Sequence, residues 1–309
     1  FDASGFRRHA QEFEDPDISV DLANQLCLVT GANSGLGYAT TLQLASRGAR
    51  VWMLCRNPER GARALQEIQN QVGTDRVELR QLDLSSAESI RRFVADMEDI
   101  PIHALVHNAG VLPAERHITE DGLELCLATN LVGPFLLTAL LWPRLAMASA
   151  PRIVHVSSGG MYARRLDLQA LQGRKGEYDG VLAYAHTKRG QVIASEQLAA
   201  ILRSKGIGVH CMHPGWADTP GVRSSIPTFW KVTKGILRTP EQGADTITWL
   251  AAVNRELSQS GQFWFDRKPR ATHLLPRTQE TDAERAALWD ALMGWAGIAN
   301  EDTIWPSPD

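Results

Sequence analysis

The sequence is poor in cysteine, which excludes several classes of small or metal-bound domain. It has four cysteines in 309 residues, scattered and without a Cys-x-x-Cys pair, so neither a disulfide framework nor a cysteine-based metal site is expected. The histidine spacings do not suggest a metal site either. We interpret the thiols as reduced, which favours a reducing compartment such as the cytoplasm. The cysteines are Cys27, Cys55, Cys126 and Cys211.

An excess of charge of one sign is also absent. Lys and Arg number 32 against 35 Asp and Glu, so the formal net charge is -3. Without a basic field, the chain has little with which to hold nucleic acid or an anionic membrane surface. We therefore predict no nucleic-acid partner.

Long hydrophobic runs are missing as well. The longest apolar stretch, residues 131–145, is interrupted by Pro134, Pro143 and Arg144, and it falls short of the ~20 apolar residues that span a bilayer. We predict a buried helix there and no integral membrane segment. Residues 1–20 are acidic and polar, with no apolar core of signal-peptide length. Peripheral contact of the protein with a membrane remains an open alternative.

What the sequence does contain is a regular alternation of short apolar runs and longer helical patterns. The runs are continuous rather than alternating, which is typical of strands buried on both faces. Such an order predicts an α/β fold with a doubly wound, parallel, Rossmann-like sheet of about seven strands and helices on both faces. Ligands then bind beyond the carboxyl ends of the strands. The predicted strands are 26–30, 50–55, 77–81, 103–107, 152–157, 208–212 and 262–265, and the main predicted helices are 38–47, 59–71, 87–97, 123–148 and 185–204.

No linker or repeat divides the chain, so we predict one catalytic domain at residues 25–266. Residues 1–24 form an N-terminal extension, and residues 267–309 form a C-terminal tail with a short helix at 281–295. Residues 164–179 look inserted between the fifth strand and the next helix, and we expect them to form a flap near a substrate mouth.

A glycine-rich segment follows the first predicted strand. Residues 30–37 read Thr-Gly-Ala-Asn-Ser-Gly-Leu-Gly and lead directly into a helix. Glycines let the backbone approach a pyrophosphate, whose charge the helix N-terminus stabilises. The spacing is Gly-x-x-x-Gly-x-Gly rather than Gly-x-Gly-x-x-Gly, and a plain strand-to-helix turn is the alternative. The candidate cofactor contacts are Gly31, Asn33, Ser34, Gly35, Leu36 and Gly37.

The second predicted strand ends at Cys55-Arg56-Asn57, where an NAD-specific site would carry an acidic residue. The planar fork of Arg56 suits a 2′-phosphate instead. Alone, Arg56 fits a solvated surface arginine equally well, but together with the glycine loop it favours NADP(H), with Asn57 beside it.

Two further strand ends carry candidate cofactor contacts. Asp83 and Leu84 follow the third strand, and Asn108, Ala109 and Gly110 follow the fourth. Small residues at these positions leave room for a cofactor against the backbone. The amide of Asn108 is equally suited to tying neighbouring loops together.

The pair Tyr184 and Lys188 gives the sharpest chemical signal. Residues four apart on a helix share a face, so the phenol and the ammonium point to the same side. A nearby cation lowers the phenol pKa from its reference value near ~10 and makes acid–base catalysis easier. Such a pair is common by chance, but Ser158 lies just past the fifth strand and Asn130 lies in the preceding helix.

Taken in order along the chain, these motifs and residues 214–219 (Pro-Gly-Trp-Ala-Asp-Thr) resemble the single-domain branch of the short-chain dehydrogenase/reductase superfamily. The resemblance implies that Tyr184 is the general acid or base and that Lys188 lowers its pKa and holds the nicotinamide ribose. It also implies that Ser158 bonds the substrate oxygen and that Asn130 anchors a water that relays protons. The residues that would contact the nicotinamide end are Pro214, Gly215 and Thr219, beside Tyr184 and Lys188.

Two departures from the family pattern stand out. His107 replaces a second asparagine, and 26 residues separate Ser158 from Tyr184, which reflects the insertion. The resemblance further implies a homodimer or homotetramer in which the helices at 123–148 and 185–204 pair with those of a second copy.

The function predicted from the sequence is an NADP(H)-dependent oxidoreductase. It would interconvert an alcohol and a ketone or aldehyde, a lipophilic one if the aromatic side chains line the pocket. Core packing explains these side chains about as well. An NADPH-binding sensor or scaffold without turnover is the alternative. The substrate candidates are Met161, Trp216, Phe229 and Trp230.

Overall fold

A computed structural model describes residues 1–13, 21–73, 75–174, 176–253, 259–299 and 304–306. It contains an eight-stranded sheet in the order β3-β2-β1-β4-β5-β6-β7-β8, in which all neighbours are parallel except β7 and β8. The strand order reverses between β1 and β4, which is where ligands bind in such sheets. The strands are β1 Leu26–Thr30, β2 Arg50–Cys55, β3 Val77–Gln81, β4 Ala104–His107, β5 Arg152–Val156, β6 Gly208–Met212, β7 Phe263–Phe265 and β8 Lys268–Arg270.

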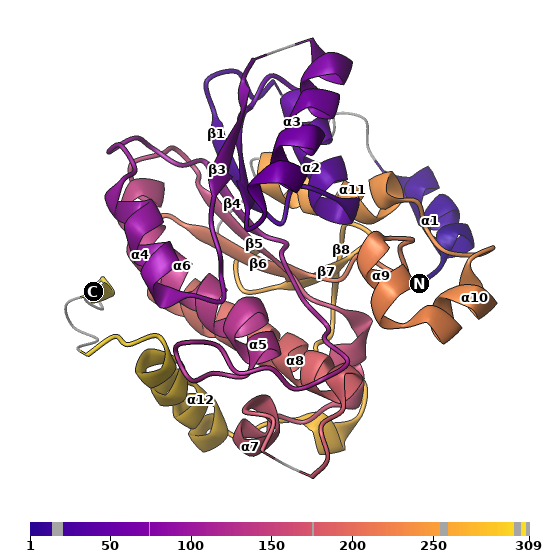
Figure 1. The fold of residues 1–309 in the computed structure, drawn as a ribbon, viewed down its shortest axis with the longest axis vertical. Helices are drawn as coiled ribbons and strands as arrows, with labels where there is room; N and C mark the ends of the chain where they lie inside the picture. The colour runs from indigo at the N-terminus through magenta and orange to yellow at the C-terminus, as the bar shows by residue number, and fades with distance from the viewer. Residues whose placement is uncertain (14–20, 74, 175, 254–258, 300–303, 307–309) are drawn as a thin grey trace.

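Helices cover both faces of the sheet, as predicted (Figure 1). One apolar core lies under α2, α3 and α11, and the other lies under α4, α6, α8 and α12. Continuous burial along β1, β5 and β6 accounts for the unbroken apolar runs in the sequence. The longer helices are α2 Gly35–Ala45, α3 Pro58–Val72, α4 Ala87–Ala95, α6 Gly133–Leu145, α8 Gly180–Ile201, α11 Pro240–Ala252 and α12 Asp282–Trp295, and the shorter ones are α1 Ala3–His9, α5 Leu125–Leu127, α7 Leu168–Leu171, α9 Pro220–Ser225 and α10 Pro227–Thr233.

The expected count of about seven strands misses β8. After β7 the chain turns at Asp266 and Arg267, both with positive φ, and β8 pairs antiparallel with β7. All three residues of β8 are exposed, so no apolar run marks it in the sequence. The expected domain boundary at residue 266 therefore falls inside a hairpin of the sheet.

The expected helix at 123–148 is three consecutive segments. A π-helical turn at Ala128–Val132 separates α5 from α6, and such turns are frequent at functional sites. The stretch Leu125–Leu145 is long and apolar enough to cross a membrane by length and composition, but its apolar window is 83% buried inside the protein. The expectation of a buried helix at 131–145 is thus met.

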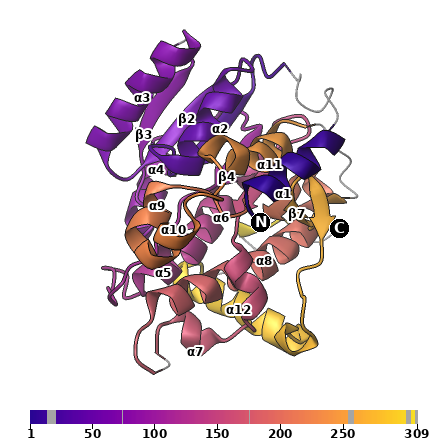
Figure 2. The same cartoon turned by 90° about the vertical axis from the view of Figure 1, so that its right-hand side faces the viewer.

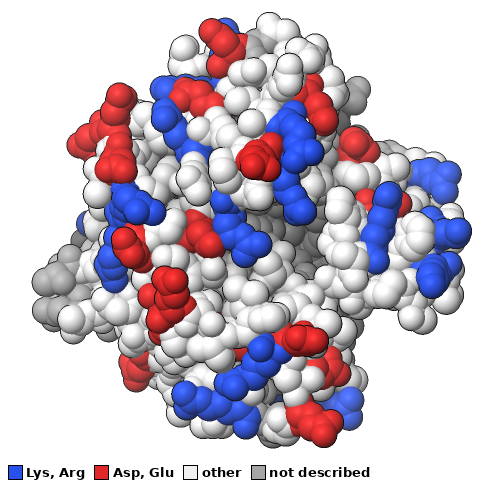
Figure 3. Space-filling view, in the orientation of Figure 1, with Lys and Arg blue, Asp and Glu red and all other residues white. Residues whose placement is uncertain are grey.

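Helices α1, α9 and α10 lie on the same side of the molecule (Figure 1), and Phe1 packs against His213, just after β6, and against Phe265 of β7. Figure 2 shows this side of the molecule. On the face seen in Figure 3, basic and acidic side chains are intermingled. The four cysteines are free and buried.

Candidate active site

The glycine loop leaves the N-terminus of α2 open to a ligand. Ser34 is the N-cap residue, yet its side chain makes no capping hydrogen bond, so the first backbone N–H groups of α2 remain free to bind an anion. Gly31 has a φ of 65°, and a Cβ there would lie 2.9 Å from Ala109 Cα. A Cβ on Gly37 would lie 2.3 Å from Gly31 O. Positions 31 and 37 therefore accept only glycine, and the backbone amides of this turn face a cavity.

Asn108 ties the glycine loop to the end of β4. Its Nδ2 donates to Thr30 O at 2.9 Å and to Gly31 O at 3.3 Å. Thr30 Oγ1 accepts from the backbone N–H groups of Asn108 and Ala109, each at 3.0 Å. Of the two roles left open by the sequence, the structural one is thus realised, while Asn108 also borders the cavity.

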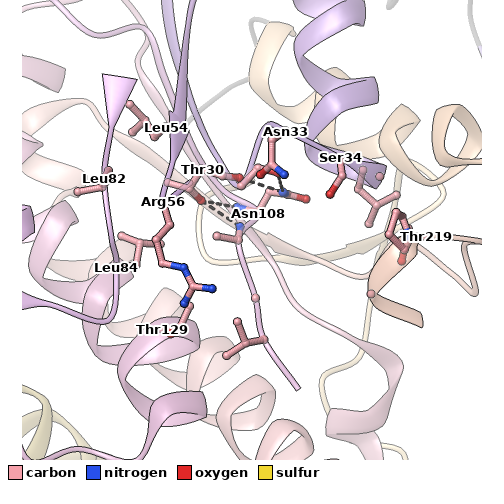
Figure 4. A pocket seen from close by; sticks show the side chains of 18 of the residues that line it. Thr30, Asn33, Ser34, Leu54, Arg56, Leu82, Leu84, Asn108, Thr129 and Thr219 are labelled. Atoms are coloured by element: carbon pink, nitrogen blue, oxygen red, sulfur yellow. Dashed lines mark hydrogen bonds between the residues drawn. The ribbon is translucent and has the colours of Figure 1, made fainter. Parts of the chain in front are cut away.

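The cavity beside this loop has a volume of about 290 Å³. Figure 4 shows the Arg56 side chain reaching into it from the end of β2. The sequence-predicted cofactor residues that line it are Gly31, Asn33, Ser34, Gly35, Leu36, Arg56, Asp83, Leu84, Asn108, Ala109, Gly110 and Thr219.

Two predicted cofactor residues have other roles. Asn57 does not line the cavity; it is the N-cap of α3, and its side chain accepts from the Arg60 backbone N–H at 2.8 Å. Gly37 instead allows the close approach of α2 to Gly31 and Asn108. A capping position two residues after a strand has the same sequence signature as a cofactor contact, and a cofactor contact of Asn57 stays a prediction.

A second cavity, of about 710 Å³, adjoins the first, with Leu36, Arg56, Asn108, Gly110 and Thr219 among the shared wall residues. Its wall is mostly apolar and brings together Ser158, Tyr184 and Lys188 with Pro214 and Gly215. The first three come from the end of β5 and from the second and third turns of α8. The fold thus unites these predicted catalytic side chains.

The Tyr184 phenol lies in a packed environment. Burial raises the pKa of Tyr184 to about 12, while a hydrogen bond with Ser158 acts in the opposite direction. Burial is the dominant influence on this pKa, and Lys188 Nζ lies 5.5 Å from the Tyr184 ring centroid. The phenol therefore keeps its proton at neutral pH.

Two hydrogen bonds hold the ammonium group of Lys188 in place. Its Nζ donates to Val156 O at 2.7 Å and to Gln191 Oε1 at 3.2 Å. Burial lowers the pKa of Lys188 to about 8. Gln191 was not predicted from the sequence, although its position three residues after Lys188 places the two on the same helical face.

Asn130 lies in the π-helical turn and is fully buried. Its Oδ1 accepts from Val111 N at 2.8 Å, and its Nδ2 donates to Val111 O at 3.0 Å. A Cβ on Gly110 would lie 3.5 Å from Asn130 Oδ1 and 3.6 Å from Lys188 Nζ. Asn130 therefore fixes the loop after β4 close to Lys188, without forming part of the wall of either cavity.

The substrate candidates divide into two pairs. Trp216 and Phe229 line the larger cavity, and their rings meet edge to face with centroids 5.5 Å apart. Met161 instead has no exposed surface and packs in a small core cluster with Cys211 and Phe263. Trp230 donates its Nε1–H to Asp218 Oδ1 at 3.0 Å and is not part of the wall. Met161 and Trp230 are thus corrected to packing roles.

The inserted segment does not form the expected flap. None of its described residues lines the larger cavity. Tyr178 donates instead to Glu124 Oε1 at 3.0 Å, and Glu124 accepts from the first amides of α5. The insertion thus braces the start of the helix that leads to Asn130. Wall residues that the sequence did not reveal include His117, Leu125, Val181, Val222 and Ile226.

Comparison with known proteins identifies the family. The model of the short chain dehydrogenase family matches residues 25–228. Dehydrogenase/reductase SDR family member 12 from Bos taurus is 40% identical over 292 residues, which is 94% of this chain and 92% of that protein.

Two further proteins extend the comparison. Human retinol dehydrogenase 11 is 36% identical over 284 residues, or 91% of this chain and 88% of that protein. The crystal structure of a putative uncharacterized protein from Mycobacterium paratuberculosis has a TM-score of 0.72 at 28% identity, covering 90% of this chain and 95% of that one. This chain is a member of the short-chain dehydrogenase/reductase family, the oxidoreductases whose fold it shares.

Proposed function

We propose that this protein is an NADP(H)-dependent oxidoreductase that interconverts a lipophilic alcohol and the corresponding ketone or aldehyde. The observation that carries the proposal is the position of Ser158, Tyr184 and Lys188 in the wall of a mostly apolar cavity. That cavity adjoins a second one at the open N-terminus of α2. A proton donor and a dinucleotide cradle are thereby neighbours.

The cradle residues fit a phosphorylated dinucleotide. The first amides of α2 would bind the pyrophosphate, and Asp83, Leu84 and Ala109 would border the adenosine half. Arg56 lines both cavities, and its guanidinium suits a 2′-phosphate, whereas a carboxylate at the end of β2 would favour NAD(H). When bound, the nicotinamide cofactor donates or accepts the hydride.

The side chains of the larger cavity supply the proton chemistry. In the direction of reduction, Ser158 and Tyr184 donate hydrogen bonds to the carbonyl oxygen. Tyr184 then transfers its proton to that oxygen as the carbon receives hydride, and an alcohol results. At neutral pH the phenol of Tyr184 carries the proton that this direction requires. In oxidation the tyrosinate takes the proton, and the Lys188 ammonium stabilises it.

The apolar wall favours a lipophilic substrate. Trp216, Phe229, Val222 and Ile226 surround the space in front of Tyr184, and burial of an apolar substrate there is favourable by about 25 cal/mol per Å². The relative named retinol dehydrogenase 11 carries a lipophilic alcohol in its name, which supports the same substrate class. We also propose the cytoplasm as the compartment, because the four buried thiols are free.

A titration with NADPH and, separately, with NADH tests the cofactor assignment by quenching of tryptophan fluorescence. Micromolar binding of NADPH with much weaker binding of NADH is expected. Equal affinities would remove the assignment to NADP(H), but they would leave the oxidoreductase proposal intact.

A screen of aldehydes and ketones of increasing size, with Tyr184→Phe as blank, tests turnover. The alternative, an NADPH-binding sensor or scaffold, would bind NADPH but would not oxidise it in the presence of any of the carbonyl compounds. Tight NADPH binding, together with equal rates of NADPH oxidation by the wild type and the Tyr184→Phe variant, would favour that alternative.

A further inference from the structure

A buried ion pair lies behind the wall of the larger cavity. Arg238 and Asp266 form two hydrogen bonds, with Nη1–Oδ1 at 2.6 Å and Nη2–Oδ2 at 2.9 Å. Both side chains are only 1% exposed. The proposed chemistry does not use either residue.

The N-terminal segment completes the surroundings of this ion pair. Arg238 Nε donates to Phe1 O at 2.9 Å and to Asp2 O at 3.2 Å. The guanidinium lies 5.2 Å from the centroid of the Phe6 ring, and His9 Nδ1 lies 2.6 Å from Asp266 Oδ2. Residues 1–9 therefore close over Arg238 from one side. Figure 2 shows α1 beside α11 and β7, two elements that are distant from it in the sequence.

On its other side, Arg238 holds the loop that forms the cavity wall. Its backbone N–H donates to Trp216 O at 2.7 Å, and its backbone O accepts from Asp218 N at 2.9 Å. A Cβ on Gly215 would lie 2.4 Å from Arg238 Nε, so only glycine permits this approach. Gly215 also has a φ of 78°. The loop thus lies directly on the guanidinium.

The N-terminal segment also contacts the loop directly. Phe1 O accepts the Trp216 backbone N–H at 2.9 Å. The Phe1 ring lies edge to face against Trp216, with centroids 6.1 Å apart, and against His213, with centroids 4.5 Å apart. Because Trp216 is a wall residue of the larger cavity, the position of that wall depends on residues 1–9.

We propose that residues 1–9 act as a strap that positions Trp216 through Arg238 and so determines how large a carbonyl substrate the cavity accepts. Arg238 and Phe6 are positioning residues in this arrangement. The part that concerns substrate size rests on the function proposed above, whereas the part that concerns the position of the loop does not.

The chain provides a matched control for Arg238. Arg267 also pairs bidentately with a carboxylate, that of Asp245, and it also lies under a phenylalanine of the N-terminal segment, 4.2 Å from the Phe13 ring centroid. Its backbone N–H donates to Thr246 Oγ1. These contacts are with α11 and residue 13, and they do not include the loop at 214–219.

The test compares Arg238→Lys with Arg267→Lys. Lysine keeps the charge opposite each aspartate but lacks the planar fork and the Nε donor. Hydrogen exchange is measured on peptides that cover residues 214–219, without any ligand. Faster exchange in Arg238→Lys than in both Arg267→Lys and wild type is expected. Phe6→Ala, which removes a half-buried ring, provides a second variant if Arg238→Lys does not fold.

Steady-state kinetics then test substrate size. With Arg238→Lys or Phe6→Ala, KM for the bulkiest accepted carbonyl is expected to rise about fivefold, which is the effect of losing one aromatic contact. KM for the smallest carbonyl should change less than twofold, and Arg267→Lys should leave both KM values unchanged.

Equal exchange at 214–219 in the two arginine variants overturns the strap, whatever the activity. An equal rise in KM for large and small carbonyls overturns its role in substrate size. A wild type that turns over no carbonyl refutes the proposed function, and the exchange comparison still decides on the strap.

Discussion

The ring of Phe135 on α6 meets the ring of Trp289 on α12 edge to face, with centroids 5.1 Å apart. Trp142 on α6 donates its Nε1–H to Ile304 O, and Arg285 on α12 pairs with Glu196 on α8 at 2.7 Å. The C-terminal tail therefore packs on the two helices that, by family resemblance, would pair with a second copy. We propose that the tail takes the place of the expected pairing with a second copy, because it covers apolar surface of α6 and α8 that such pairing would bury.

We accordingly expect a monomer, measured as a mass near 34.0 kDa by light scattering. Trp289→Ala should lower the free energy of unfolding by about 3 kcal/mol, since it removes a buried aromatic ring. It should also promote self-association through the exposed face of α6. Leu274→Ala, at a side chain that is 65% exposed, is the control and should change neither. A wild-type dimer whose mass is unaffected by Trp289→Ala would contradict this prediction.

The phenol of Tyr184 is expected to carry the proton transfer. Tyr184→Phe removes the hydroxyl and keeps the ring, so kcat should fall by about 10²–10⁴-fold, the usual size of a general acid–base contribution. The affinity for NADPH should remain within a factor of about three, because the cradle lies on other residues. Tyr162→Phe is the matched control, since its hydroxyl donates to Ala271 O outside the site. Comparable kcat values for the two variants would remove the role assigned to Tyr184.

Arg56 is expected to discriminate between the two nicotinamide cofactors. A hydrogen-bonded ion pair with a 2′-phosphate contributes about 1.5–3 kcal/mol, so Arg56→Ala should weaken NADPH binding by roughly tenfold or more. NADH binding should change little, because NADH carries no phosphate there. Arg60→Ala, at an exposed position on α3, is the control. Affinities are measured by fluorescence titration, and equal losses for both cofactors would exclude the proposed contact.

The parallel, doubly wound sheet with helices on both faces was predictable from the sequence, because continuous apolar runs indicate strands that are buried on both faces. The strand β8 was not, since Lys268, Pro269 and Arg270 carry no apolar signal and pair only through a turn with positive φ at Asp266. The helix α12 was predicted, but its packing on Phe135 was not. An amphipathic pattern identifies an apolar face without naming its partner.

Within the site, the residues predicted from a reactive side chain in a motif lie in the cavity wall more often than the residues predicted only from a large apolar side chain. Ser158, Tyr184 and Lys188 do meet in one cavity wall. Met161 and Trp230 were chosen only as large side chains near the motifs, and they pack elsewhere. The hydrogen bond between Lys188 and Gln191 could not be predicted from the sequence, because no sequence pattern distinguishes a buried glutamine.

Lys188 makes the proposed activity sensitive to alkaline pH. Burial lowers its pKa to about 8, and the groups that face it are the Val156 carbonyl, Gln191, the thiols of Cys126 and Cys211 and, more distantly, His107 and His155. Burial lowers the pKa of both histidines and raises that of both thiols to about 12. All four are therefore neutral between about pH 7 and pH 11. Within this range, Lys188 is the member of the cluster that changes charge.

If the ammonium of Lys188 is the active form, kcat/KM should fall as pH rises through about 8, because this ratio reports ionisations of the free enzyme. Gln191→Leu removes an acceptor from the ammonium and should move the alkaline limb down by about one pH unit, the equivalent of one hydrogen bond to a charged group. Gln191→Glu supplies a carboxylate instead and should move the limb up. Opposite shifts distinguish an electrostatic role of Gln191 from a packing defect, which would lower the rate without moving the limb. A limb that stays in place in both variants would show that Lys188 is not the group that titrates.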